Sequence, residues 1–397
     1  MLLTMNTHEK STFYVAPTGN DVHPGTEDQP FGTIQKAADT ARAGDTIVVR
    51  AGVYREAVVM PFSGEAGKPI TLKNYPGERP IIQPPERGNK PDGQGISLRA
   101  EEGYINPIGW IIIEGFEIRH GWDGIKLYNA HDIIIRDNYI LANYHQGILG
   151  NGNRVRIERN IIAENGTNPD ERPNQLHGIY GTGTEFIIVN NLIHSNLAYG
   201  IHVAAYAFNA SRHAAPEYSG AKDWHIANNT IALNKHRSGI VLWQEGVENC
   251  IVENNIFYRN GSVNGIHFLS QGGKEHIVRN NIFFPPGPSL SSAEPKAFKD
   301  IDNQRTDPRL VNPNAWDFRL RPDSPARGSG YPAGTDIGAS DLELDAGSKG
   351  GPGGEGPGGG DTSGGDTDGD NDSNMRRIVL IAVVVIVVIL LGVFLFR

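Results

Sequence analysis

Most of the chain repeats one short pattern of apolar and polar residues. In each copy apolar residues alternate with polar ones, an Asn follows, Ile or Phe stands two residues after it, and a Gly-Ile dipeptide comes further along. This alternation has the period of two that is typical of β-strands. Six copies align on their first Asn, at Asn138, Asn160, Asn191, Asn229, Asn255 and Asn281.

The spacing of the copies predicts a solenoid. Asn138 and Asn160 lie 22 residues apart, and Asn255 and Asn281 lie 26 apart, which is enough for three short strands and three turns. One such coil cannot bury its own interior, so neighbouring coils must stack. We therefore predict an all-β fold, a parallel β-helix that is right-handed because parallel strands connect with that sense. Stacking places an Ile ladder inside and an Asn ladder at a bend, where Asn tolerates the left-handed backbone conformation.

The two ends of this domain have different compositions. Residues Thr33 to Arg42 have helical composition with apolar residues at Ile34, Ala37, Ala38 and Ala41, which predicts an N-terminal helix that caps the open end of the solenoid. We expect residues 1–11 to be disordered and the β-helix domain to cover residues 12–345. Residues 346–374 are rich in Gly and Asp and are expected to form a flexible linker. Residues 378–396 are uninterruptedly apolar and long enough to predict a single transmembrane helix.

Composition narrows the range of functions. The formal net charge is −9 and the basic residues are scattered, so the chain has no basic footprint for nucleic acid. Its single cysteine, Cys250, excludes an intramolecular disulfide and a cysteine zinc site. Cys250 and Trp224 fall in the inward column of the repeat and are expected in the core. The N-terminus lacks the basic and apolar regions of a secretory signal peptide.

Three segments carry a resemblance to a known group of proteins. Residues 13–56 (FYVAPTGNDVHPG…VVRAGVYRE) resemble the N-terminal region of right-handed β-helix proteins related to chondroitinase B and the family 9 polysaccharide lyases. The repeats HGIYG, IVENNIFYRNG and IVRNNIFF look like the parallel β-helix repeat of the same pectin-lyase-like superfamily. Residues 307–339 are similar to the closing segment of many exported members. The resemblance implies the fold and, because many members are polysaccharide lyases, hydrolases or epimerases, an acidic polysaccharide as partner.

The active-site motifs of the better-known branches are missing. The nearest segment to the Gly-His-Gly of polygalacturonase-like hydrolases is Leu176-His177-Gly178, without the paired aspartates. The Asp-Pro-His-Asp tetrad of mannuronan epimerases is also absent. The resemblance therefore transfers no catalytic residue, and hydrolysis and epimerisation are less favoured than lyase activity.

Candidate residues follow instead from which side chains point outward. In each Gly-Ile strand the Ile points inward, so the next residue points outward. We call these residues the outward column: Ser97, Lys126, Leu149, Tyr180, His202, Val241 and His267. The residues just before the dipeptide add Asp123, His177 and Tyr199. Two insertions beside these coils, residues 166–176 and 204–223, bring Arg172, Arg212 and His213, which are suited to pair with a carboxylate or sulfate.

The chemistry of β-elimination suggests roles for these side chains. A cation neutralises the carboxylate of a uronic acid, a base removes the C5 proton, and an acid protonates the leaving oxygen. We predict His202 as base, Tyr180 as its acid or base partner, His177 as a further catalytic residue, and Lys126 or Arg212 as charge neutraliser. Calcium is the alternative neutraliser. We expect Asp123, Tyr199, Arg172, Arg212, His213 and His267 to bind substrate.

Each of these residues has a structural interpretation as well. Histidines on a β-helix face are commonly plain surface residues, His177 can bond a neighbouring turn, and Lys126 can be a solvated charge. The chain is thus predicted to bind acidic polysaccharide and to cleave it by β-elimination. The alternatives are a non-catalytic glycan-binding or adhesion module and a structural solenoid. Arg376 and Arg377 before the predicted span favour a cytoplasmic domain, whereas a polysaccharide partner favours the extracytoplasmic side, which is our prediction.

Overall fold

The computed structural model describes residues 9–168, 175–205, 220–269, 273–287, 289–292, 298–339 and 342. All of them belong to the first of the two compact units of the chain, Met1–Glu343. The predicted linker and transmembrane segment, residues 346–374 and 378–396, lie outside the described residues. Within the described part, no helix is long and apolar enough to cross a membrane.

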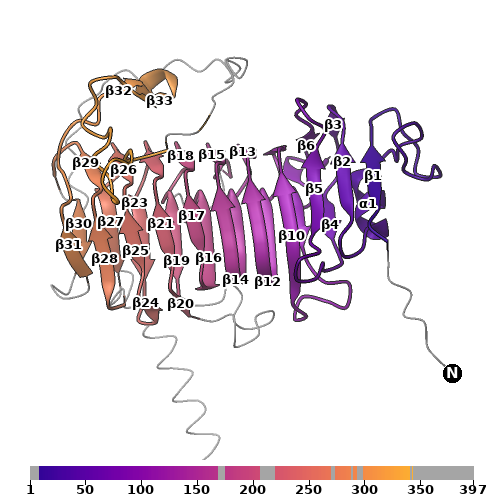
Figure 1. Ribbon diagram of the computed structural model, residues 1–397, viewed down its shortest axis with the longest axis horizontal. Helices are drawn as coiled ribbons and strands as arrows, with labels where there is room; N and C mark the ends of the chain where they lie inside the picture. The colour runs from indigo at the N-terminus through magenta and orange to yellow at the C-terminus, as the bar shows by residue number, and fades with distance from the viewer. Residues whose placement is uncertain are drawn as a thin grey trace, which may run out of the picture. The chain divides into compact units, whose positions relative to one another are not determined.

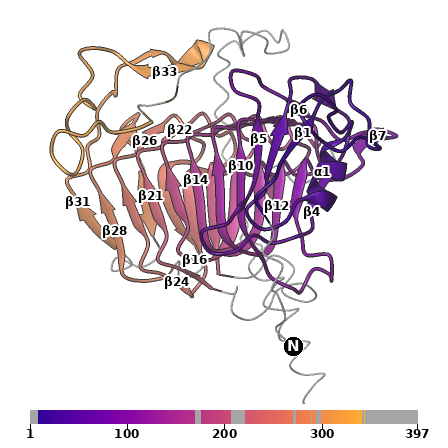
Figure 2. The ribbon, with the colours of Figure 1, turned by 45° about the vertical axis from the view of Figure 1, so that its right-hand side comes forward.

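The described chain is a parallel β-helix whose coils follow one another from the indigo to the orange end in Figure 1. Each coil contributes one short strand to each of three ladders, and the strands of successive coils lie side by side (Figure 2). A first ladder pairs β4 (Val58–Met60), β9 (Ile96–Leu98), β12 (Ile125–Arg136), β14 (Ile148–Glu158), β16 (Ile179–Thr184), β19 (Ile201–Ala204), β23 (Ser238–Trp243), β27 (Val263–Leu269) and β30 (Leu290–Ser292).

The other two ladders complete the coils. The second comprises β1 (Thr12–Val15), β2 (Thr46–Val49), β5 (Ile70–Asn74), β10 (Ile108–Glu114), the second halves of β12 and β14, β17 (Ile187–Val189), β21 (His225–Ala227), β25 (Ile251–Glu253), β28 (His276–Arg279) and β31 (Phe298–Ile301). The third comprises β3 (Val53–Tyr54), β6 (Ile81–Ile82), β11 (Glu117–Arg119), β13 (Tyr139–Leu141), β15 (Ile161–Ala163), β18 (Leu192–His194), β22 (Thr230–Ala232), β26 (Ile256–Tyr258) and β29 (Ile282–Phe284). The prediction of parallel strands in stacked coils is confirmed.

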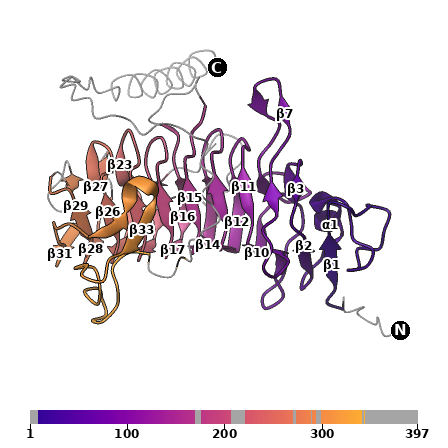
Figure 3. The same cartoon turned by 90° about the horizontal axis from the view of Figure 1, so that it is seen from above.

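A few elements lie outside these ladders. Strand β20 (Ala221–Lys222) pairs with the last two residues of β16, and β24 (Val247–Glu248) pairs with β20. The hairpin of β7 (Glu86–Arg87) and β8 (Lys90–Pro91) projects from the coils (Figure 3). A C-terminal hairpin joins β32 (Leu310–Asn312) to β33 (Asp317–Leu320) through the 3-10 turn η3 (Pro313–Ala315). Its Trp316 and Phe318 rings pack against His194 on β18, with ring centroids 5.3 and 5.1 Å away.

The predicted helix is present as α1 (Ile34–Thr40), beside β1 at the N-terminal end (Figure 1). The Thr33 side chain accepts a hydrogen bond from the Lys36 backbone N–H at 3.1 Å and so caps the helix. Ile34, Ala37 and Ala38 are buried, as their spacing predicted. The role of α1 in capping the open end of the solenoid stays a prediction.

The predicted inward column forms the core. Ile135, Ile157, Ile188, Ile226, Val252 and Val278 are all 0% exposed. Trp224 and Cys250 are also 0% exposed, which confirms both as core residues. The Trp224 ring stacks on Phe186 with centroids 4.1 Å apart.

The Asn ladder is present and is hydrogen-bonded along its whole length. The Asn191 backbone N–H donates to the Asn229 Oδ1 at 2.9 Å, and the Asn191 side chain donates to Oδ1 of the same residue at 3.0 Å. The same two bonds join successive members from Asn138 to Asn303. The left-handed residue, however, is the one before each ladder Asn, such as Asp137, Arg159 and Asn190. Our assignment of that backbone conformation to the ladder Asn itself was wrong, because the ladder Asn faces inward to bond the next coil.

The Gly of each Gly-Ile dipeptide has a steric cause. A Cβ on Gly178 would lie 2.7 Å from the carbonyl oxygen of Gly200 in the next coil and 2.8 Å from the Asn196 Nδ2. Such a contact is too short for any side chain, so this position admits only glycine. Glycine therefore recurs at this position because adjacent coils approach each other closely there.

Candidate functional site

The outward column is assembled as the strand alternation predicted. Strand pairing places Ser97 beside Lys126, then Leu149, Tyr180, His202, Val241 and His267 on successive strands of the first ladder. Adjacent strands lie roughly 4.8 Å apart. His202 and Tyr180 are therefore direct neighbours, whereas Lys126 lies three strands from His202, roughly 14 Å away.

A second row runs beside the column, at the residue before each Gly. The Asp123 Oδ1 accepts a hydrogen bond from the Gln146 backbone N–H at 3.1 Å. The Gln146 Oε1 accepts from the His177 N–H, and the His177 Nδ1 accepts from the Tyr199 N–H at 3.3 Å. The side chains of Asp123, Gln146 and His177 thus each bond the backbone of the next coil. Asp123 and His177 have a structural role here, as the alternative interpretation of His177 expected.

Four of the predicted site residues come together at β16 and β19. The His177 Nε2 lies 3.0 Å from the His202 Nδ1. The Tyr180 and His202 rings are stacked, with centroids 4.3 Å apart and an interplanar angle of 2°. The Tyr199 ring lies 5.4 Å from His202 and 5.2 Å from His177. We call His177, Tyr180, Tyr199 and His202 the histidine cluster.

Burial keeps the histidine cluster uncharged near neutral pH. It lowers the pKa of His202 to about 3 and holds that of His177 well below its usual value, with a further contribution from the neighbouring ring. It raises the pKa of Tyr180 to about 12 and that of Tyr199 above its usual value. At pH 7 both imidazoles are neutral and both phenols keep their protons.

Two other predicted residues lie apart from the histidine cluster. The Lys126 Nζ is 3.2 Å from the Oδ2 of Asp123, whose side chain is fully buried. The Lys126 ammonium also lies 5.7 Å from the centre of the Tyr128 ring. His267 stands two strands beyond His202, roughly 10 Å away. The structure therefore does not place Lys126 and His202 on the same sugar residue.

Arg237 is a candidate that the sequence analysis missed. It is partly exposed and directly precedes β23. The carbonyl oxygen of its neighbour Ser238 accepts a hydrogen bond from the Gly200 N–H at 3.4 Å, which places the Arg237 backbone on the coil next to Tyr199. Its positive charge also opposes protonation of His177 and His267. Within the described residues it has no ion pair. The sequence contained a signal for Arg237. This residue lies two positions before Gly239, just as His145 lies two positions before Gly147, and it is one position from the row that contains His177.

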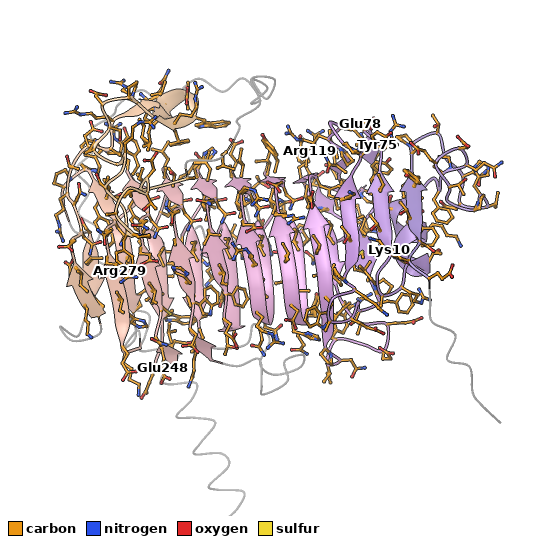
Figure 4. The ribbon with its side chains drawn as sticks, viewed as in Figure 1. Lys10, Tyr75, Glu78, Arg119, Glu248 and Arg279 are labelled. Carbon is orange, nitrogen blue, oxygen red and sulfur yellow. The ribbon has the colours of Figure 1, made fainter. Side chains whose placement is uncertain are left out.

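Some other surface cations are paired with carboxylates. Arg279, labelled in Figure 4, lies 2.5 Å from a carboxylate oxygen of Glu253, and Glu248 pairs with Lys222 at 2.9 Å. Arg50 pairs with Glu78 at 2.7 Å. An arginine that has no such carboxylate and lies beside neutral rings is suited to hold an anion.

Polar atoms without a partner gather on the same coils. Across the described ranges, three buried side-chain atoms lack a hydrogen bond: His202 Nε2, Gln244 Oε1 and His267 Nδ1. They belong to β19, to the residue after β23, and to β27, which are consecutive in the first ladder. Buried polar atoms are normally hydrogen-bonded, so these three atoms call for partners that the described chain does not supply.

The remaining predictions concern metal and loops. Among the residues that the structure describes, no group of three or more His, Cys, Asp or Glu side chains is arranged to hold a metal ion. Calcium as charge neutraliser thus stays a prediction without a described ligand set. Arg172, Arg212 and His213 lie outside the described residues.

Comparison with known proteins shows which sequences and folds this chain resembles. Residues 13–167 match the family model described as the Pel9A-like, right handed beta helix region. The chain is 38% identical over 96 residues to the pectate lyase PEL9 of Emericella nidulans, which is 23% of each protein. It is 31% identical over 131 residues to the uncharacterized protein YwoF of Bacillus subtilis, covering 32% of this chain and 28% of that protein. The matches thus span only about a quarter of each relative's length.

The fold extends beyond the region of sequence similarity. The crystal structure of pectate lyase Pel9A superposes with a TM-score of 0.55 and 15% identity, covering 86% of this chain and 98% of that one. At this identity the likeness establishes the fold alone. Residues 13–167 are therefore similar to the Pel9A-like right-handed β-helix region, and the chain shares the parallel β-helix fold of pectate lyase Pel9A.

Proposed function

We propose that this β-helix binds an acidic polysaccharide along the outward column, with Arg237 as the group that receives the negative charge. The observation that carries the proposal is Arg237 itself, a cation without an ion pair in the described chain beside the histidine cluster. An arginine in such a place is the side chain best suited to a carboxylate or sulfate. The ring of Tyr180, which is partly exposed, offers a surface on which a sugar ring can pack.

The similarity to pectate lyases supports an acidic glycan rather than a neutral one. The PEL9 protein of Emericella nidulans, to which 96 residues of this chain are 38% identical, is a pectate lyase. The column runs across successive coils at the strand spacing of roughly 4.8 Å. A linear polymer laid along the solenoid axis therefore meets Lys126, the histidine cluster and His267 in turn.

Cleavage by β-elimination is a second candidate function. It is favoured by Lys126 and Arg237, two cations on one strip, and by the protonated phenol of Tyr180, which is suited to protonate a leaving oxygen. His202 as the base stays a prediction. Since burial lowers the pKa of His202 to about 3, its basicity is far from the value that suits a general base near pH 7. Binding is therefore the better supported of the two functions.

Substitution of Arg237 tests the proposal. We expect Arg237→Gln to weaken binding of polygalacturonate at least tenfold, about 1.4 kcal/mol, because the ligand carboxylate loses its counter-charge. Isothermal titration calorimetry of polygalacturonate, alginate and chondroitin sulfate on wild type and variant measures the change. Arg319→Gln removes the same charge from an exposed residue that pairs with Asp317 and should leave binding unchanged.

Two results would count against the proposal. If wild-type protein binds none of the three acidic polysaccharides, the function is wrong. If it binds them but Arg237→Gln binds equally well, Arg237 does not receive the charge. Absorbance of unsaturated uronate in the same mixtures reports cleavage, and binding without that product leaves a non-catalytic glycan-binding module.

A further inference from the structure

We infer that His202 recognises an oxygen of the ligand as a neutral N–H donor, and that His177 is a positioning residue which fixes the proton on the His202 Nε2. This deepens the proposed function and rests on it for the nature of the ligand. The inference follows from a chain of hydrogen bonds that begins at a backbone amide and ends at the unpartnered atom of His202.

The proton on His177 is determined by its backbone partner. The Tyr199 N–H donates to the His177 Nδ1 at 3.3 Å, so that nitrogen presents its lone pair. A neutral imidazole carries a single proton, which must then be on Nε2. The same position in the preceding coil confirms the pattern, because there the Gln146 side-chain oxygen accepts the His177 N–H.

The proton on His202 follows from that of His177. The His177 Nε2 lies 3.0 Å from the His202 Nδ1 and donates its proton there. The lone pair of the His202 Nδ1 is thus occupied, and the proton of the neutral His202 ring is on Nε2. A proton on Nδ1 instead would face the proton of His177 across 3.0 Å. The neutral ring therefore has no lone pair at Nε2 to receive a C5 proton, which opposes the predicted role of His202 as base.

The Nε2–H of His202 has nothing to bond in the described chain. Its nitrogen is buried without a partner, and the whole residue is only 9% exposed. A buried donor left unpaired is destabilising, so natural sites pair such a group with protein, water or ligand. A ligand oxygen at this point would complete the chain of hydrogen bonds.

Neighbouring rings fix the direction of this donor. Tyr180 stacks flat against His202 at 4.3 Å, and the Trp243 ring contacts it at 5.4 Å with an interplanar angle of 66°. The ring therefore has little freedom to turn. Arg237 directly precedes β23, which pairs with the strand of His202, so a directed donor and a cation lie on adjacent coils. This pair fits the carboxylate of a uronate or the sulfate of a sulfated sugar.

Burial lowers the pKa of the neighbouring His177 and raises the pKa values of Tyr180 and Tyr199, so these groups are uncharged near neutral pH. Burial also lowers the pKa of His202 to about 3, so the donor keeps its proton near neutral pH without gaining a charge.

Histidine-selective 15N NMR of the ligand-free protein at pH 7 tests the proton positions directly. We expect His202 and His177 each to carry their proton on Nε2. In His177→Leu, which removes the donor to the His202 Nδ1, we expect the His202 proton to distribute over both nitrogens. In His177→Gln, which can accept from Tyr199 and donate to His202, we expect the wild-type signal of His202.

Binding of polygalacturonate by the same variants tests the recognition. We expect His202→Phe and His177→Leu each to weaken binding about tenfold, and His177→Gln to stay within threefold of wild type. His236→Gln changes an exposed histidine and is the matched control. A His202 that is charged, or that carries its proton on Nδ1, overturns the inference whether or not polygalacturonate binds. A His202→Phe variant that binds polygalacturonate as tightly as wild type also overturns the inference. If instead the NMR result is as expected and wild type binds no acidic polysaccharide, the proposed function fails.

Discussion

Replacing Asn191 by alanine is expected to lower the free energy of unfolding by about 3–5 kcal/mol, because its side chain joins three coils. The Asn191 Nδ2 donates to the carbonyl oxygens of Ile157 and Val189 and to the Asn229 Oδ1, at 2.9, 3.0 and 3.0 Å. Its Oδ1 accepts from the Asn160 backbone N–H and side chain at 2.9 and 3.0 Å. Alanine leaves these buried groups unpaired, and each unpaired group costs about 1–3 kcal/mol.

Equilibrium unfolding in urea measures this effect. Asn89→Ala is the control, because Asn89 is exposed in the turn between β7 and β8 and should change stability by less than about 0.5 kcal/mol. A loss below about 1 kcal/mol for Asn191→Ala would mean that water or a shift of the coils replaces the ladder, contrary to the view that the ladder holds the coils in register.

Acidification from pH 7 to pH 5 is expected to destabilise the fold by about 4 kcal/mol through His194 and His202, and the lowered pKa of the buried His177 adds to this loss. Burial lowers the pKa of each from 6.5 to about 3. Between these values the unfolded chain binds a proton on each histidine and the folded chain does not, so stability falls as the pH falls below 6.5. The loss is about 2 kcal/mol for each histidine at pH 5. The raised pKa values of the Glu56 and Glu164 carboxyls act in the opposite direction and reduce the total.

The slope of unfolding free energy against pH is the quantity to measure. His194→Leu should lower the slope between pH 6.5 and pH 5, whatever it does to stability at pH 7, because it removes one of the buried histidines that resist protonation. His236→Gln alters an exposed histidine and should keep the wild-type slope. An unchanged slope in His194→Leu would show that His194 is accessible to protons despite the Trp316 and Phe318 rings that cover it.

The repeat made most of the fold predictable. Asn138 and its successors, the inward Ile residues and the Gly before each outward strand are all consequences of one requirement, that identical coils stack at the strand spacing. The outward column was predictable for the same reason, since strand alternation decides which side chains point out. The left-handed position was misplaced by one residue, because propensity favours Asn generally while packing required the ladder Asn to face inward.

The site was predictable only as far as the strand alternation reaches. The alternation predicted that Tyr180 and His202 lie in one column. It could not predict that the His177 ring accepts a hydrogen bond from the Tyr199 backbone N–H and donates one to His202. That arrangement depends on side-chain geometry between coils. Arg237 was missed because it stands at a turn, where period-two reasoning ends, although the turn carries it toward the histidine cluster. The strand alternation placed Lys126 and His202 in the same column. It did not show that three strand spacings separate the two side chains.

The Asn ladder also bears on how this protein can change over time. Its bonds keep the same length whether 22 residues separate two members, as for Asn138 and Asn160, or 38, as for Asn191 and Asn229. The added residues between Asn191 and Asn229 are accommodated between the strands, which keep their pairing with the neighbouring coils. Variants that change the number of residues between β19 and β20, and leave the strands themselves intact, would therefore keep the scaffold and alter only what borders the column. Evolution or a laboratory library can thus diversify ligand preference in this molecule without rebuilding its core.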